Sequence, residues 1–141
     1  MRRPTQLAIL LMGLLLVAPA VAQRRYSKPV PCAAAPLPLT NGELQDIFKF
    51  YNRTYWDGRL PTVLVVWTGL ENRYGETDML PDGRYVIRLD ATKNREGNVA
   101  RTTILHEMCH VRTWGEDAQH GPRWRAELHR IMLEGAFDDI V

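Results

Sequence analysis

The sequence predicts a small α+β domain in which one helix precedes three strands and two further helices follow them. Three observations support this order. Apolar residues recur at helical spacing in three segments. A β-branched run at Thr62–Thr68 and a Pro81-Asp82-Gly83 turn signal lie between the first two of these segments. The length of 141 residues suits one domain, so we expect a three-stranded sheet packed against all three helices.

Residues 1–22 have the features of a secretory signal peptide. Arg2 and Arg3 give a positive start, Leu7–Val17 is apolar, and Ala20-Val21-Ala22 is a small-x-small cleavage pattern. The apolar run is shorter than the roughly 20 residues that a membrane-spanning helix needs. We therefore expect cleavage after Ala22, export to the periplasm or the medium, and no stable membrane anchor afterwards.

Removal of the signal peptide changes the net charge. The mature chain would begin near Gln23 and keep sixteen Lys and Arg against sixteen Asp and Glu, which gives a formal charge of zero. Nucleic-acid-binding domains usually show a basic excess on one face. We therefore expect no nucleic-acid partner.

Residues 23–39 form a proline-rich extended segment rather than a regular element. Four prolines lie within these seventeen positions, and three alanines lie between the second and the third of them. Cys32 lies in this segment, and the other cysteine is Cys109. In an exported protein the two can form a disulfide or stay free, and their spacing leaves both possibilities open.

The first helix is expected at residues 41–56. Thr40 and Glu43 have the spacing of a capping box, which marks a helix start. The buried face is formed by Leu44, Ile47, Phe48, Tyr51 and Tyr55. The segment Asp57–Pro61 should end the helix.

Three strands are expected next. Residues 62–68 are apolar on both faces, which predicts a strand buried on both sides. A hairpin should form around the Pro-Asp-Gly turn, with arms near 73–80 and 85–89. In the second arm Tyr85, Ile87 and Leu89 alternate with arginines, which predicts one buried and one solvated face.

Two helices complete the domain. The first should run from about Asn98 to Thr113. The second should begin at Pro122, a residue favoured at the first helical position, and end at Gly135. The apolar stripe of this last helix consists of Trp124, Leu128, Ile131 and Met132.

A His-Glu-x-x-His motif, from His106 to His110, lies inside the second predicted helix. Four residues turn a helix by about 400°, so the two histidines differ by only about 40° in direction and lie about 6 Å apart along the axis. Both imidazoles can therefore reach one metal ion, while Glu107 can take a proton from a water at that ion. The alternative is a pair of core histidines with Glu107 exposed to solvent.

A catalytic zinc site needs a third protein ligand, and His120 is the strongest candidate. Gly121 permits close approach of the backbone, and Pro122 restricts the residue before it to an extended conformation, which would aim His120 at a fixed point. Glu127 and His129 of the last helix are weaker alternatives.

This ligand set predicts a Zn²⁺-dependent hydrolase, most simply a peptidase, with Glu107 as general base. It is not a metzincin, because Thr113 and Glu116 stand where that pattern needs Gly and His. Glu116 and its neighbour Asp117 are expected to be solvated loop acids. Two alternatives stay open: a zinc-stabilised module that binds extracytoplasmic peptides without cleaving them, and a hydrolase of non-peptide amides.

The sequence resembles the SprT-like family, the zincin type also found in the Spartan DNA–protein crosslink proteases. Four segments carry the resemblance in order: Tyr55–Pro61, the strand Val63–Trp67, Thr103–His110 with the motif, and His120–Trp124. Together they cover about residues 40–135. The His-Glu-Met-x-His motif followed by His-Gly-Pro is the specific part.

The resemblance implies a small zincin-like metallopeptidase domain over residues 40–141, with the three histidines as zinc ligands and Glu107 as the catalytic residue. In this class of fold the strand nearest the motif helix lines the substrate cleft, and Tyr85–Asp90 is our candidate for that strand. Two features depart from the family. No cysteines for a C-terminal zinc ribbon occur before Val141, and the signal peptide and zero net charge do not fit a DNA-repair role. We therefore expect a peptide or protein substrate.

Overall fold

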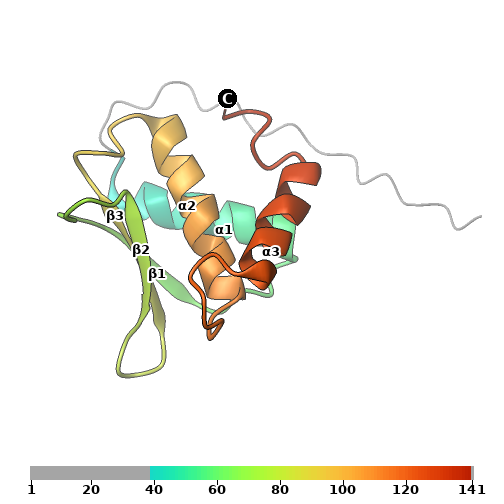
Figure 1. Cartoon of the computed structure of the whole chain (residues 1–141). Helices are drawn as coiled ribbons and strands as arrows, with labels where there is room; N and C mark the ends of the chain where they lie inside the picture. Colours follow the sequence, from blue (N-terminus) through green and yellow to red (C-terminus); the bar gives the residue numbers. More distant parts are fainter. Residues whose placement is uncertain (1–38, 141) are drawn as a thin grey trace, which may run out of the picture. The chain divides into compact units, whose positions relative to one another are not determined.

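A computed structural model describes residues 39–140, and the order of its elements confirms the predicted α+β class (Figure 1). The elements are α1 (Asn41–Trp56), β1 (Val63–Thr68), β2 (Gly75–Met79), β3 (Tyr85–Asp90), α2 (Gly97–Arg112) and α3 (Pro122–Leu133). The predicted signal peptide and nearly all of the proline-rich segment, including Cys32, lie outside the described residues. Within the described part, no helix is long and apolar enough to cross a membrane.

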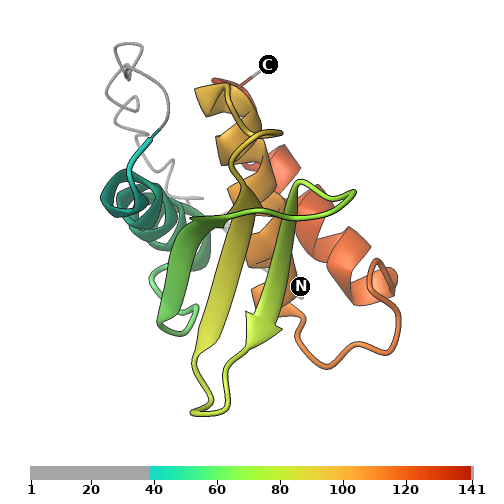
Figure 2. The same cartoon turned by 90° about the vertical axis from the view of Figure 1, so that its left-hand side faces the viewer.

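The sheet has the strand order β1-β3-β2, so that β3 is central (Figure 2). β1 pairs with β3 in parallel, with Val65 opposite Ile87. β2 pairs with β3 antiparallel, with Thr77 opposite Ile87. The hairpin around the Pro-Asp-Gly turn therefore forms as predicted, and β1 adds to the far side of its second arm.

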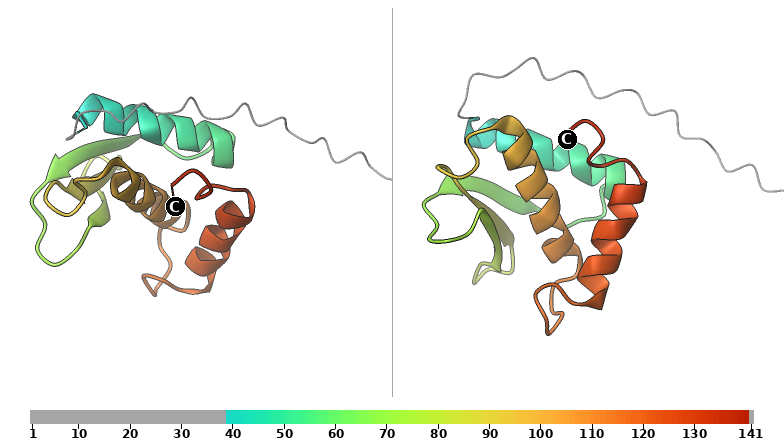
Figure 3. Two further views of the ribbon diagram at one scale, coloured as in Figure 1. Left: turned by 90° about the horizontal axis from the view of Figure 1, so that it is seen from above. Right: turned by 45° about the horizontal axis from the view of Figure 1, so that its top comes forward.

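The hydrophobic core lies between one face of the sheet and the helices. Helices α1 and α2 lie over the same face of the sheet (Figure 3). Alternate residues of β1 and β3 point into the core and pack against apolar residues of these two helices. The sheet contributes Val63, Val65, Ile87 and Leu89, and the helices contribute Leu44, Phe48, Ile104, Leu105 and Met108. α3 closes the core with Trp124 and Ile131.

Helix α1 begins and ends where the sequence predicts. The Thr40 hydroxyl accepts a hydrogen bond from the Glu43 amide at 3.2 Å, and the Glu43 carboxylate accepts from the Thr40 amide at 2.7 Å. This capping box satisfies two amides at the start of the helix. At the other end Asp57 and Gly58 take positive φ angles of 53° and 72°, which reverses the chain toward β1.

The prediction that β1 is buried on both faces is wrong. Leu64 is 47% exposed, because the helices cover only one face of the sheet. The free edge of β1 is nevertheless covered by polar side chains of α1. The Gln45 side chain donates to Val63 O at 2.9 Å and accepts from Val65 N at 3.1 Å, and Asn41 accepts from Trp67 N at 3.0 Å.

Strand β3 is more buried than predicted. Ile87 and Leu89 lie in the core as expected, but on the other face Val86 and Asp90 are buried as well. Arg88 is half-buried and pairs with Glu76 of β2 at 3.2 Å. A central strand has neighbours on both sides, and these neighbours shield the face that was predicted to be solvated.

A buried polar network joins β3 to α2. The Asn94 side chain donates to Asp90 O at 2.8 Å and to Tyr74 O at 2.7 Å, and it accepts from the Thr103 hydroxyl at 2.6 Å. The Asp90 carboxylate accepts hydrogen bonds from the Thr92 hydroxyl and from the Leu70 amide, which hold its pKa well below the ordinary value. This network fixes α2 relative to the start of β2.

Candidate metal centre

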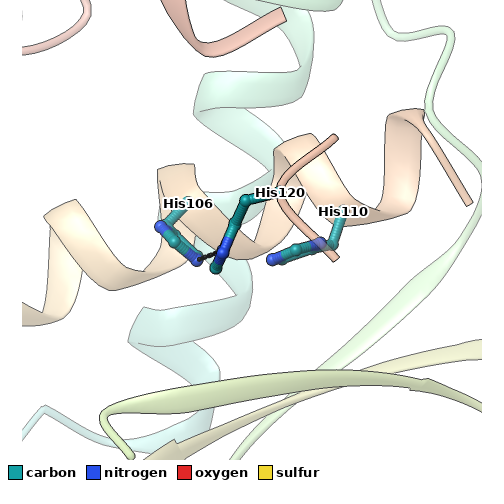
Figure 4. A group of neighbouring side chains, drawn as sticks. All are labelled: His106, His110 and His120. Carbon is teal, nitrogen blue, oxygen red and sulfur yellow. Dashed lines mark hydrogen bonds between the residues drawn. The ribbon is translucent and has the colours of Figure 1, made fainter. Parts of the chain in front are cut away.

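The structure brings the three predicted histidines together at one point (Figure 4). His106 and His110 project from the same side of α2, and His120 reaches them from the loop before α3. The Nε2 atoms of His106 and His120 lie 3.1 Å apart, and one ring nitrogen of each histidine lies within 4.8 Å of the others. The three residues could therefore hold a metal ion.

The chemistry of this donor set fits such an ion. Two nitrogens bound at about 2.1 Å to one tetrahedral ion lie about 3.4 Å apart, close to the His106–His120 separation. Burial, together with the charge of His120, lowers the pKa of His106 to about 4. Burial and the charges of both other histidines lower the pKa of His110 to about 4 as well. His106 and His110 are therefore neutral at physiological pH, which is the form that binds metals.

The position of His120 depends on a contact that the sequence did not indicate. The Glu116 carboxylate accepts hydrogen bonds from the amides of Arg123 and Trp124, both at 2.9 Å, and so caps the start of α3 from the loop. Any Cβ on Gly121 would collide with this carboxylate. The prediction that Glu116 is a solvated loop acid is therefore wrong, whereas Asp117 is exposed as expected.

Trp124 lies against all three imidazoles. The ring centroids of His120, His106 and His110 lie 4.3, 4.7 and 5.4 Å from that of the indole. The indole is buried, and its Nε1 has no hydrogen-bond partner among the described residues. Trp124 therefore forms an aromatic wall for the cluster, which limits the orientations of the three rings.

The two alternative ligands do not join the cluster. Glu127 accepts hydrogen bonds from Arg130 Nη2 at 2.7 Å and from Trp56 Nε1 at 2.6 Å. Burial raises the pKa of Glu127, but these two hydrogen bonds and the charges of Arg130 and Arg112 together lower it below its ordinary value. His129 is exposed on α3. Neither residue is part of the histidine group, and His120 is the residue that completes it.

Glu107 lies beside the cluster on α2 and is only 4% exposed. Its Oε2 accepts a hydrogen bond from the Thr77 hydroxyl of β2 at 2.8 Å. Burial raises the pKa of Glu107 to about 7, although the hydrogen bond from Thr77 acts in the opposite direction. A carboxyl group with this pKa can gain or release a proton near neutral pH, which is the property that a general base needs.

This raised pKa predicts a pH-dependent difference in stability between the metal-free wild type and its Glu107→Gln variant. Between pH 4.5 and 7 the folded wild type keeps a proton that the unfolded chain releases. The contribution of Glu107 is therefore complete below about pH 4.5 and is lost as the pH rises through 7. We expect the variant to gain up to about 3 kcal/mol on the wild type across this range. Urea unfolding in the presence of a chelator measures the free energy of unfolding of both proteins at each pH. If the difference between the two proteins did not change with pH, the pKa of Glu107 would not be raised in the folded protein.

Cys109 lies within the motif, is fully buried, and forms no disulfide within the part of the chain that the structure describes. Burial raises its pKa to about 12, so it stays protonated and unreactive. It serves as a small core residue between α2 and its neighbours. The predicted alternative of a disulfide involves Cys32, which lies outside the described residues.

An open cleft of about 1350 Å³ contains the cluster. β2 and the segment before it form one wall, α2 forms another, and the loop before α3 closes one end. The lining residues include all three histidines, Glu107 and Thr77. The expectation that Tyr85–Asp90 lines the cleft is wrong, because this strand is β3 and both of its edges are paired within the sheet.

The chain matches the SprT-like family over residues 44–138. The matched region runs from the first buried residue of α1 to a position just beyond the end of α3. It contains the whole sheet, all three histidines and Glu107.

Proposed function

The chain belongs to the SprT-like family, and on that premise we propose that it is an exported zinc metallopeptidase. The observation that carries the proposal is the convergence of His106, His110 and His120 in an open cleft beside a buried carboxyl group. A site that only stabilises a fold is closed by four protein ligands. Three histidine donors facing a cleft, with an acid of raised pKa next to them, favour catalysis instead.

His106, His110 and His120 would hold the zinc ion. When bound, zinc would lower the pKa of a coordinated water to about 7 and polarise the substrate carbonyl. Glu107 accepts the proton of the attacking water and returns it to the leaving amine. Its burial keeps bulk water away from this proton transfer, and the bond from Thr77 holds one of its two oxygens.

A peptide substrate would bind along β2 rather than along β3. β2 is the free edge of the sheet on the cleft side, whereas the edge of β1 is occupied by side chains of α1. Pairing to an exposed strand edge is a common way to hold an extended peptide. The strand order thus favours β2, and not the Tyr85–Asp90 strand suggested by the sequence, as the strand beside the substrate.

The ladder between β2 and β3 shows which residues of β2 are free to pair. Asp90 N donates to Tyr74 O at 2.9 Å, and Leu80 N donates to Arg84 O at 2.7 Å. In an antiparallel pair such bonded positions alternate with positions whose amide and carbonyl groups point away. Thr77 and the other odd-numbered residues of β2 therefore direct their backbone groups toward the cleft.

Export and the absence of a nucleic-acid partner rest on the sequence. The first 22 residues supply the signal peptide pattern, and the chain that follows it is formally neutral. We propose that the mature protein acts on peptides or unfolded proteins outside the cytoplasm.

The test starts from the full chain, expressed in bacteria and purified from the periplasm or the medium. N-terminal sequencing should show a start at Gln23. Zinc-loaded protein incubated with an unfolded protein should yield new peptide termini by mass spectrometry, and a chelator should stop the cleavage until zinc is restored. Peptide binding without new termini would favour the zinc-stabilised module that binds peptides without cleaving them. Turnover of non-peptide amides alone would favour a hydrolase of such amides.

A further inference from the structure

We propose that Thr77 is a positioning residue that holds the Glu107 carboxylate and ties it to the strand on which the substrate would lie. The expected effect on kcat rests on the proposed function, because it requires Glu107 to be the general base. The contact itself can be tested without any metal. No sequence pattern points to Thr77, because its role depends on β2 packing against α2.

The contact is direct. Thr77 Oγ1 lies 2.8 Å from Glu107 Oε2 and 3.2 Å from the main-chain oxygen of the same residue. A hydroxyl has one proton to donate, and the shorter distance assigns it to the carboxylate. No described residue donates to the other carboxylate oxygen, Oε1. One oxygen of Glu107 is therefore held, and the other remains able to accept a proton.

The close packing of β2 on α2 leaves little freedom around this bond. A Cβ on Gly75 would lie 2.6 Å from Thr103 Cγ2 and 3.0 Å from Glu107 Oε1, so glycine is required for the approach. Thr103 cannot easily move away, because its hydroxyl is bonded to the buried Asn94 at 2.6 Å. The contact between Gly75 and Thr103 thus sets the distance across which Thr77 meets Glu107.

The other face of β2 is held by Arg88 of β3. Arg88 Nη1 lies 3.2 Å from Glu76 Oε1 and 3.5 Å from Asp78 Oδ2. Glu76 and Asp78 flank Thr77 in the sequence, and successive side chains of a strand point to opposite faces of the sheet. The ion pairs with Arg88 therefore lie on the face of β2 opposite to the Glu107 contact. The strand therefore presents Thr77 from a fixed backbone.

Thr77 thus links the general base to the strand edge along which the substrate would bind. The backbone groups of Thr77 face the open edge of the sheet, while its side chain holds Glu107. A glutamate side chain has several rotatable bonds, and proton transfer needs it within hydrogen-bond reach of its partner. A peptide paired with β2 would lie at a fixed offset from Thr77, and hence from the carboxylate.

The test compares Thr77→Val, which removes the hydroxyl but keeps the shape, with Thr77→Ser, which keeps the hydroxyl. We expect Thr77→Val to lower kcat about 10- to 100-fold, with KM and zinc content close to wild type. Thr77→Ser should recover kcat to within about 3-fold of wild type.

Thr54→Val is the matched control. The Thr54 hydroxyl donates to Phe50 O on α1 at 2.9 Å, and Thr54 does not line the cleft. This variant undergoes the same chemical change and should keep its kcat. The proposal is overturned if Thr77→Val keeps kcat within about 3-fold of wild type, if Thr54→Val loses as much, or if Thr77→Ser recovers nothing. If the valine variant does not fold, Thr77→Ala takes its place beside the serine variant.

A second readout needs neither metal nor turnover. The ¹³C chemical shift of the Glu107 side-chain carboxyl, measured at one pH in the metal-free protein, should change in Thr77→Val and return in Thr77→Ser. An unchanged shift would overturn the contact. If the wild type cleaves no peptide but the shift responds, the proposed function fails while the link from Thr77 to Glu107 stands. If the wild type cleaves and the shift does not respond, only the link fails.

Discussion

Replacement of Glu107 by Gln is expected to leave zinc bound and to lower turnover by about 1000-fold or more. General acid–base groups typically contribute about 100- to 10,000-fold to a rate, and this carboxyl would act twice in the proposed reaction. Glutamine keeps the shape and can still accept a hydrogen bond from Thr77, but it cannot take a proton. The three histidines are unchanged, so metal content should equal that of the wild type. Steady-state kinetics and elemental analysis on the same samples measure both quantities.

Glu96→Gln is the control for this substitution. Glu96 also lines the cleft, but it is exposed and lies at the start of α2, with no hydrogen bond from its side chain to the helix. The same chemical change there should leave kcat unaltered. If Glu107→Gln still cleaved substrate at more than about a tenth of the wild-type rate, Glu107 would not be the general base.

Replacement of His120 by Ala is expected to weaken zinc binding by more than about 100-fold. Removing a residue that only orients a ligand already weakens metal binding by about 10- to 100-fold, and His120 would be a ligand itself. Because His120 is exposed, the metal-free variant should unfold at nearly the same denaturant concentration as the wild type. Competition with a chromogenic chelator gives the affinity, and urea unfolding checks the fold.

His129→Ala is the matched control, since His129 is exposed on α3 and lies outside the histidine group. It should bind zinc as the wild type does. Equal zinc affinity in the His120 and His129 variants would remove His120 from the site.

The histidine cluster was predictable because its geometry is mostly local. Two histidines four residues apart on a helix must share a face, whatever the helix packs against. The Gly121-Pro122 pair marked the start of α3 and pointed to His120. The bond that secures this start, from Glu116 to the amides of Arg123 and Trp124, spans a loop, and no periodicity indicates it.

The strand order was not predictable from the same kind of pattern. The turn signal fixed β2 and β3 as neighbours but left open where β1 would add. β1 lies parallel to β3 on its far side, which makes β3 central and β2 the open edge. The error about burial at Val86 and the error about the substrate strand follow from this one missing piece of information, whereas Leu64 is exposed because the helices cover only one face of the sheet.

The residues that support Glu107 were missed for a related reason. Gly75 and Thr77 carry no motif, and each matters only through a neighbour that is distant in the sequence. Gly75 offers the one retrospective signal, since a glycine inside a strand often marks a close approach of the backbone. Here it marks the approach of β2 to Thr103 and Glu107.

The central claim is that three histidines hold a zinc ion and leave one position open for chemistry. X-ray absorption at the zinc edge, on the purified protein loaded with one equivalent of zinc, tests this most directly. We expect three imidazole nitrogens and one further light atom around the zinc, all at about 2.0–2.1 Å. A sulfur neighbour at about 2.3 Å, a fourth imidazole, or failure of the folded protein to retain zinc would contradict it.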